Sequence, residues 1–165
     1  LGKDWWKLKS FQTALSVAGL TIIDSYVSMT ELSEYAKGLP EQMAKARLYP
    51  ELPPEGMSAW CFYPMSKKRE RKANWFTLPF DERKDLMMEH GASGRKFAGR
   101  IVQLITGSAG VDDYEWGVTL FAQKPDDLKE VVYTMRFDEA SAVFGVFGPF
   151  YTGMVVPVEE LVTTL

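Results

Sequence analysis

The order in which apolar patterns follow one another after residue 57 constrains the fold of this chain more than any other feature. Strand-like stretches lie at residues 58–66, 100–106, 114–121 and 150–156, and helical periodicity lies at residues 81–97 and from Pro125 onward. The order is thus strand, helix, strand, strand, helix, strand. It predicts an α+β, ferredoxin-like fold of the dimeric α/β-barrel type, with an antiparallel sheet and helices on one face.

The first 57 residues do not continue this pattern. Residues 4–18 predict a helix, and residues 20–32, rich in Thr, Ile, Val and Tyr, predict a long strand. We interpret residues 1–35 as the remnant of an N-terminal ferredoxin-like half and residues 58–165 as a C-terminal half that carries the functional site. Residues 36–57 are expected to form a linker loop, because Gly38 and four prolines interrupt regular structure there. A further strand-like piece is expected at residues 74–78.

Composition excludes several classes of site and partner. The 165 residues include one cysteine, Cys61, and one histidine, His90, so the chain by itself forms neither a disulfide scaffold nor a Cys/His zinc site. A formal net charge of -3 provides no strong field to attract nucleic acid. No run of about 18 apolar residues and no leader pattern occur, so we expect no membrane partner and a cytoplasmic location.

The single histidine lies on the predicted helix at residues 81–97, where Met87 and Gly94 share its side. The ordinary interpretation is a packed or surface histidine, because the usual zinc partners are missing. Gly91 and Gly94 favour another interpretation, because each costs about 1 kcal/mol of helix propensity relative to alanine. A large group that approaches this backbone closely would explain them. A porphyrin fits that description, because its iron needs only one protein ligand.

A phenol, a thioether and an ammonium share one face of the strand that starts at residue 58. Tyr63, Met65 and Lys67 alternate with residues of the other face. The ordinary interpretation is a strand that runs out into a solvated basic loop. The functional interpretation is a carboxylate site, to which Arg47 and Arg136 would contribute.

Gln103 lies within an apolar strand, where an amide either has a hydrogen-bond partner or faces a ligand. The glycine-rich stretch at residues 106–117 follows it. This stretch predicts a hairpin turn rather than a phosphate loop, because it has neither a Walker lysine nor the G-x-G-x-x-G order.

Taken together, these motifs resemble the chlorite dismutase family, and within it the coproheme decarboxylases. The matching stretches occur in order over most of the chain after Ser28: RLYP (47–50), FYPMSKKR (62–69), NWF (74–76), LMMEHG (86–91), GRKF (94–97), QLITGS (103–108), DDYEWGV (112–118) and MRFDE (135–139). The resemblance implies two ferredoxin-like halves in each subunit and a ring-shaped homopentamer.

The resemblance gives His90 the role of proximal ligand to haem iron and Gln103 the distal position, where true chlorite dismutases have an arginine. A guanidinium suits retention of an anionic oxychlorine intermediate, and a neutral amide provides no such charge. The resemblance therefore implies a peroxide-dependent coproheme decarboxylase, an oxidoreductase for which iron coproporphyrin is both substrate and cofactor. Chlorite dismutase is the alternative activity, and a haem-binding or haem-transfer protein without turnover is the alternative class.

The resemblance also implies roles for the other residues. Oxidised Tyr63 removes a hydrogen atom from the β-carbon of a propionate, and loss of carbon dioxide and a second electron leaves a vinyl group; two rounds give haem b. Lys67 orients a propionate near Tyr63, and Glu139 accepts a hydrogen bond from His90. The remaining residues bind carboxylates (Arg47, Arg136, Ser141) or line the pocket (Met65, Trp75). Val143 and Val146 depart from the family pattern, which has an arginine and a glutamate there.

Overall fold

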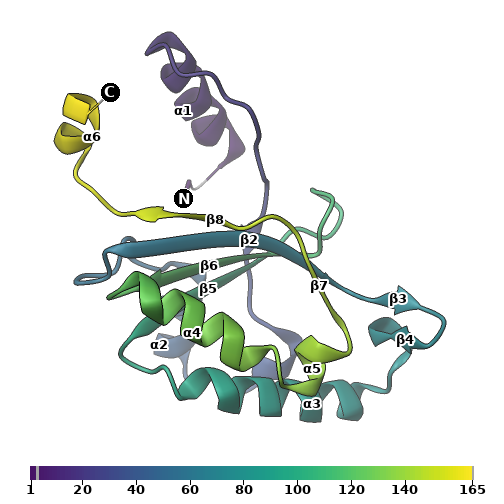
Figure 1. Cartoon of the computed structure of the whole chain (residues 1–165). Coiled ribbons are helices and arrows are strands. Elements are labelled where there is room, and N and C mark those ends of the chain that lie inside the picture. Colours follow the sequence, from purple (N-terminus) through teal and green to yellow (C-terminus); the bar gives the residue numbers. More distant parts are fainter. Residues whose placement is uncertain (3, 165) are drawn as a thin grey trace.

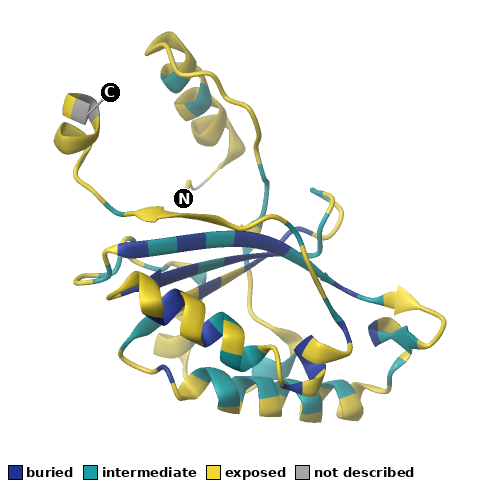
Figure 2. Cartoon of the chain, in the orientation of Figure 1, coloured by how far each residue is buried: buried dark blue, intermediate teal, exposed yellow. Residues whose placement is uncertain are grey.

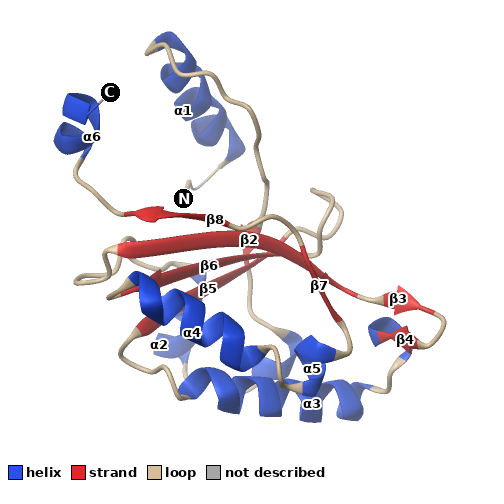
Figure 3. Cartoon of the chain, in the orientation of Figure 1, coloured by secondary structure: helices blue, strands red, loops and turns tan. Residues whose placement is uncertain are grey.

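The computed structural model describes residues 1–2 and 4–164, and Figures 1 and 3 show its elements. The helices are α1 (Trp5–Val17), α2 (Glu41–Leu48), α3 (Phe80–Arg95), α4 (Pro125–Met135), α5 (Glu139–Ala142) and α6 (Val158–Thr164). The strands are β1 (Met29–Thr30), β2 (Ala59–Lys67), β3 (Arg69–Glu70), β4 (Ala73–Asn74), β5 (Ile101–Gly107), β6 (Trp116–Ala122), β7 (Gly145–Phe147) and β8 (Tyr151–Met154). Two short 3-10 turns are η1 (Glu34–Ala36) and η2 (Trp75–Thr77).

One antiparallel sheet forms the centre of the molecule, in the strand order β1-β5-β6-β2-β7. The two edge strands β7 and β8 pair with opposite ends of β2, on the side away from β6. From β2 onward, the predicted order of strand, helix, strand, strand, helix, strand is confirmed, and so is the β5–β6 hairpin. With β5, β6, β2 and the β7–β8 edge in this spatial order, the sheet has ferredoxin-like topology.

The main core lies on the side of the sheet that faces α3, α4 and α5, which we call the inner face. Paired residues of antiparallel strands share a face, so Val118 of β6 lies between Tyr63 of β2 and Ile105 of β5. Leu128 and Val131 of α4 pack on the β2 and β6 part of this face. Figure 2 shows the buried residues gathered on the central strands and on one side of α4. This helix begins with Pro125, whose missing N–H is not needed at a first helical position.

α3 packs against α4 and α5 rather than directly on the sheet, and none of its 16 residues is buried. Only Phe97, just beyond its end, enters the main core. A Cβ atom at Gly94 would meet the Met135 side chain at 3.6 Å, an ordinary contact distance, so packing against α4 does not by itself require glycine there.

The predicted strand at residues 20–32 is mostly wrong, because only β1 pairs, with the last two residues of β5. The chain before β1 is held by side chains of the turn at residues 108–112 instead. The backbone N–H of Val27 donates to Asp112 Oδ2 at 2.8 Å, and the hydroxyls of Tyr26 and Ser108 form a hydrogen bond. These contacts replace a ladder that β5 is too short to provide.

Two further expectations need correction. The predicted linker contains α2, which begins directly after Pro40 and ends before Pro50, so the prolines bound a helix rather than prevent one. The predicted strand at residues 74–78 is largely a 3-10 turn, because the Asn74 side chain accepts the N–H of Phe76 at 3.1 Å.

The short elements α5, α6 and β7 were not predicted. The division into residues 1–35, 36–57 and 58–165 stays a prediction.

α1 and α6 lie on the opposite side of the sheet from α3, α4 and α5 (Figure 1). The predicted helix at residues 4–18 is confirmed as α1, and none of its residues is buried. Over residues 1–2 and 4–164, no helix combines the length and the apolar character needed to cross a membrane.

Truncation of a core residue tests this arrangement. Leu120 is 1% exposed, so Leu120→Ala leaves a cavity and is expected to lower the free energy of unfolding by about 2–5 kcal/mol. Urea unfolding followed by circular dichroism measures the loss. Val156→Ala is the control, because Val156 is 45% exposed, and a change within about 0.5 kcal/mol is expected. Equal losses in the two variants would contradict this placement of the core.

Candidate functional site

The imidazole of His90 on α3 is oriented by Asp138. Its Nδ1 lies 3.0 Å from Asp138 Oδ2, and the Asp138 side chain is only 1% exposed. A carboxylate accepts but does not donate, so Nδ1 carries the proton and the lone pair of the neutral ring lies on Nε2. Asp138 is itself fixed as the N-cap of α5, where its Oδ1 accepts the backbone N–H of Ser141 at 2.9 Å. Nε2 is therefore presented on the side of the ring away from Asp138.

The surroundings keep this imidazole neutral. Burial lowers the pKa of His90 below its ordinary value, and the charge of Lys67 adds to this, while the charge and hydrogen bond of Asp138 oppose it. Neutral imidazole is the form that binds a metal. Because the side chain is still 25% exposed, it is held in place without being sealed in the core.

Lys67 at the end of β2 is buried, and its ammonium is directed at α5. Nζ donates to the Ala140 carbonyl oxygen at 2.6 Å and lies 4.7 Å from the centre of the Trp75 ring. Burial lowers the pKa of Lys67 to about 8, and the Asp138 carboxylate opposes this shift. The Ala140 carbonyl takes one of the three N–H donors of this ammonium, and the role of Lys67 as a propionate holder beside Tyr63 stays a prediction.

Tyr63 lies on the inner face of β2 and is 8% exposed. Its ring stacks on Phe150, with 4.4 Å between ring centres, and Phe147 lies beside it at 5.9 Å. Burial raises the pKa of Tyr63 far above its ordinary value, so the side chain is a neutral phenol. Within the described part of the chain, no group accepts or donates a hydrogen bond at its hydroxyl.

Gln103 of β5 lies on the same inner face, yet its side chain is exposed. It pairs with Leu120, which belongs to the main core, so the amide is on the helix side of the sheet. Ile105, two residues further along β5 on that face, is 39% exposed. The inner face is thus covered by α4 over β2 and β6 and is accessible over β5, on the side of the sheet where α3 lies (Figure 1).

The prediction that Glu139 accepts the hydrogen bond of His90 is wrong. Glu139 is exposed, and Asp138, one residue earlier, holds the ring. Sequence reasoning missed Asp138. The signal that could have found it is the N-cap pattern, because Asp138 directly precedes a short helix and Ser141 lies three positions on.

The other predicted pocket residues lie in three different surroundings. Ser141 is buried, with its Oγ 3.4 Å from His90 Nδ1, and its role in binding a carboxylate stays a prediction. Trp75 is 4% exposed in a second core cluster, and Met65 is half-buried beside the main core. Arg47 on α2 and Arg136 after α4 are exposed, and neither forms an ion pair with another described residue.

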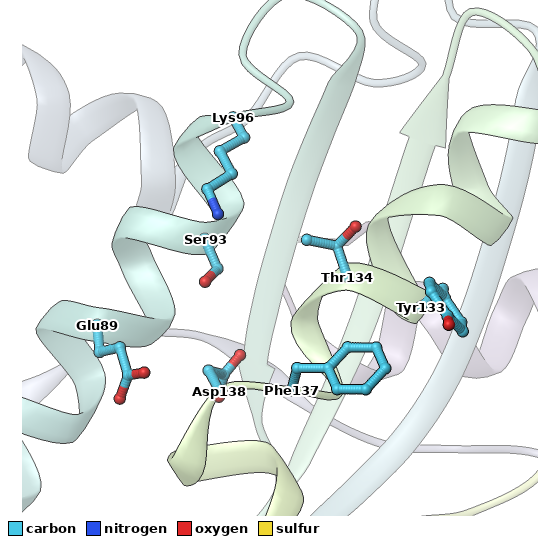
Figure 4. Close-up of a pocket in the computed structure, with 7 residues that line it drawn as sticks. All are labelled: Glu89, Ser93, Lys96, Tyr133, Thr134, Phe137 and Asp138. Carbon is cyan, nitrogen blue, oxygen red and sulfur yellow. The ribbon is translucent and has the colours of Figure 1, made fainter.

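An open pocket of about 300 Å³ lies between α3 and α4, and Asp138, the hydrogen-bond partner of His90, is part of its lining (Figure 4). It is lined by Glu89, Ser93, Lys96, Tyr133, Thr134, Phe137 and Asp138. Of these residues, only Asp138 forms a hydrogen bond with the His90 ring. None of the residues predicted from the sequence lines this pocket, so it is not where they converge.

Comparison with known proteins establishes the family. The family model described as chlorite dismutase matches residues 6–156. The chain therefore belongs to the chlorite dismutase family. A coproheme decarboxylase of Staphylococcus carnosus is 54% identical over 145 residues, which cover 84% of this chain and 57% of that protein. A coproheme decarboxylase of Staphylococcus saprophyticus is 49% identical over 143 residues, with 83% and 57% covered. The chain thus spans a little over half the length of these relatives.

Solved structures agree with the predicted fold class. A haem-binding protein from Thermus thermophilus has a TM-score of 0.90 and 40% identity over 98% of this chain and 67% of that one. A mutant chlorite dismutase from Candidatus Nitrospira defluvii has a TM-score of 0.79 and 20% identity over 99% of this chain and 69% of that one. The α+β, ferredoxin-like prediction is confirmed.

The residues at this site fit an iron porphyrin. No group of three or more His, Cys, Asp or Glu that could hold a bare metal ion exists among the described residues. A porphyrin supplies four nitrogen ligands of its own, so a single neutral His90 with a free Nε2 suffices. The accessible inner face over β5 adds one amide, from Gln103, and apolar surface from Ile105.

The buried ammonium of Lys67 predicts a pH dependence of stability. Its folded-state pKa of about 8 lies below the ordinary value of 10.5, so between these values the unfolded chain binds more protons and the free energy of unfolding rises with pH. Relative to Lys67→Met, which does not titrate, the native protein should gain roughly 2–4 kcal/mol across this window. Urea unfolding at a series of pH values measures the gain. A difference between the two proteins that does not change with pH would contradict the burial of this charge.

Proposed function

We propose that this chain carries the porphyrin-binding part of a peroxide-dependent coproheme decarboxylase, which converts two propionates of iron coproporphyrin III into vinyl groups and yields haem b. The observation that carries the proposal is the placement of Tyr63. A buried neutral phenol shares the inner sheet face with the neutral amide of Gln103, on the side where α3 presents His90. The two Staphylococcus coproheme decarboxylases support the same activity.

The overall reaction is balanced for each propionate. When bound, iron coproporphyrin together with hydrogen peroxide supplies the oxidising equivalents. One propionate carboxylate, one hydrogen peroxide and one proton give one vinyl group, one carbon dioxide and two water molecules. The chain's own residues must therefore bind the substrate, keep one face of it near Tyr63 and provide a route for one hydrogen atom.

Tyr63 provides that route. Its raised pKa prevents formation of a phenolate, so the phenol gives up its electron and its hydroxyl proton together. The phenoxyl then removes a hydrogen atom from the propionate β-carbon, which regenerates the phenol, and loss of carbon dioxide and a second electron completes the vinyl group. No described residue hydrogen-bonds the Tyr63 hydroxyl, so we assign the acceptor of its proton to the substrate carboxylate.

The proposal also gives roles to His90 and to two exposed arginines, Arg47 and Arg136. Asp138 accepts the Nδ1 proton of His90 in a hydrogen bond and so raises the electron-donating strength of Nε2. We assign propionate binding to Arg47 and Arg136, because both guanidinium groups are exposed and without an ion pair in the described part of the chain. Gln103 would provide a neutral amide toward the bound porphyrin from the inner face of β5.

Two other functions compare less well with these observations. For a chlorite dismutase, the neutral Gln103 provides no charge that could retain an oxychlorine anion. A haem-binding or haem-transfer protein is the second candidate, and the haem-binding protein of Thermus thermophilus favours it. Tyr63 separates the two remaining functions, because carriage of a haem needs no phenol beside a propionate.

We also propose a ring-shaped homopentamer in the cytoplasm. Large apolar side chains on α1 support an assembly that covers them, since Trp6 is 83% exposed and Phe11 is 62% exposed. The only cysteine, Cys61, is free and buried, as is usual in a reducing compartment.

Product mass tests the proposal directly. The protein loaded with iron coproporphyrin and titrated with hydrogen peroxide should show two successive losses, each of carbon dioxide plus two hydrogens. Tyr63→Phe keeps the ring stack on Phe150 but removes the hydroxyl, so the rate of the first loss should fall at least about tenfold. Tyr133→Phe is the control, because Tyr133 is 63% exposed on α4. Bound porphyrin without any loss would support the carrier function, and a fully active Tyr63→Phe variant would overturn the role of Tyr63.

A further inference from the structure

A hairpin directly after β2 concentrates positive charge. The basic hairpin, as we call residues 68–74, contains four of the chain's 19 Lys and Arg residues and one of its 22 Asp and Glu residues. The other residues therefore carry 15 basic and 21 acidic groups, a formal net charge of -6, against +3 on the hairpin. The ordinary interpretation of such a run is a solvated loop. Its structure and its position relative to His90 indicate a more specific role.

The frame of the basic hairpin is fixed by contacts of its own side chains. β3 and β4 pair antiparallel, with Arg69 opposite Asn74. The guanidinium of Arg69 lies 4.2 Å from the ring centre of Phe76 and forms an ion pair with Glu115. The charge of Arg69 is thus compensated, and the hairpin holds its turn residues at a defined place.

The turn of the hairpin carries two uncompensated cations. Arg71 and Lys72 form the turn between β3 and β4, and both are exposed. Neither side chain forms an ion pair with another residue in the part of the chain that the structure describes. Their charges are therefore available to an anion that approaches from solvent.

The base of the hairpin is bonded to the elements around the iron ligand. The Lys68 N–H donates to the Phe144 carbonyl oxygen at 2.8 Å, and the Lys68 carbonyl oxygen accepts the N–H of Trp75 at 3.0 Å. Phe144 follows α5, whose N-cap Asp138 orients His90. The hairpin therefore lies at the end of the molecule where α5 and the first turns of α3 lie (Figure 1).

The charges around the hairpin favour a small anion over a large one. Residues 80–96, which include α3, contain four Asp or Glu and four Lys or Arg residues, so this helix does not cancel the positive region. At physiological ionic strength the field of the turn extends about 8 Å, which is enough to act on a small anion that passes close by. A nucleic acid or an anionic membrane is much larger than the hairpin, and the net charge of -6 on the rest of the chain would repel it.

Iron coproporphyrin is a small anion of this kind, because it has four carboxylates at the rim of one macrocycle. We propose that Arg71 and Lys72 attract this substrate and speed its association with the protein, without contacting it once it is bound. The inference rests on the proposed function, which supplies the substrate. The product, haem b, retains only two of the carboxylates, so the same turn attracts it less and favours entry of substrate over product.

The association rate constant tests the proposal without any turnover. Porphyrin-free protein is mixed with iron coproporphyrin in the absence of peroxide, and the shift of the porphyrin absorption band follows binding. In Arg71→Gln/Lys72→Gln the association rate constant should fall about fivefold at about 20 mM salt and less than about twofold at about 0.5 M salt, because salt screens the attraction. The dissociation rate constant, measured by transfer of the porphyrin to excess apomyoglobin, should stay within about twofold of the native value.

Lys7→Gln/Lys9→Gln is the matched control. Both lysines are exposed on α1, on the opposite side of the sheet from α3, and their removal changes the net charge of the chain by the same amount. This variant should associate at the native rate. Arg71→Lys/Lys72→Arg exchanges the two cations and should also keep the native rate. With haem b in place of iron coproporphyrin, the effect of Arg71→Gln/Lys72→Gln should be smaller, because fewer carboxylates are attracted.

The results distinguish failure of the inference from failure of the proposed function. An association rate constant that Arg71→Gln/Lys72→Gln leaves unchanged at low salt overturns the inference. So does an equal fall in the Lys7→Gln/Lys9→Gln control, which would show an effect of net charge alone. Faster dissociation with native association also overturns it, because it would show direct contact with the bound porphyrin. Association that depends on the hairpin, followed by no loss of carboxyl groups when peroxide is added, leaves the steering intact and overturns the decarboxylase activity instead.

Discussion

The hydrogen bond between His90 Nδ1 and Asp138 Oδ2 determines the chemistry of the rest of the site. It selects the tautomer that leaves a lone pair on Nε2, and it ties the middle of α3 to the start of α5. Burial then keeps the ring uncharged. A neutral imidazole with one free nitrogen is the minimum that an iron porphyrin needs from a protein, and this chain has a single histidine to provide it.

The fold places His90 on α3, apart from the sheet but on the side of its inner face. α4 covers β2 and β6, whereas α3 packs on α4 and α5, so Gln103 and Ile105 of β5 remain accessible on the inner face. The charged and the uncharged side chains of the site are also separated from each other. Lys67 and Asp138 lie together beside Trp75 and His90, and Tyr63 lies among phenylalanine rings. In the proposed function, the phenol that is oxidised would therefore be surrounded by uncharged rings.

Strong local patterns made the second half of the fold predictable. Alternation in β2 placed Tyr63 and Lys67 on one face, and both are buried there; the periodicity of α4 and the β5–β6 hairpin were equally clear. The strand at residues 20–32 failed because propensity does not show how long a partner edge is, and β5 ends at Gly107. Glu139 was assigned to His90 from the resemblance alone, and the N-cap role of Asp138 was missed because the helix that it caps has only four residues. The direction of the Lys67 side chain depends on a carbonyl 73 positions away in the chain.

The iron–histidine stretching band in the ferrous, porphyrin-loaded protein tests the central claim that His90, oriented by Asp138, is the only protein bond to the iron. Resonance Raman spectra should show the band in the native protein, no band in His90→Gly, and a restored band when imidazole is added to that variant. In Asp138→Asn the band should move to lower frequency, because the ring donates fewer electrons. A band that persists unchanged in His90→Gly would show that another residue binds the iron and would contradict the account.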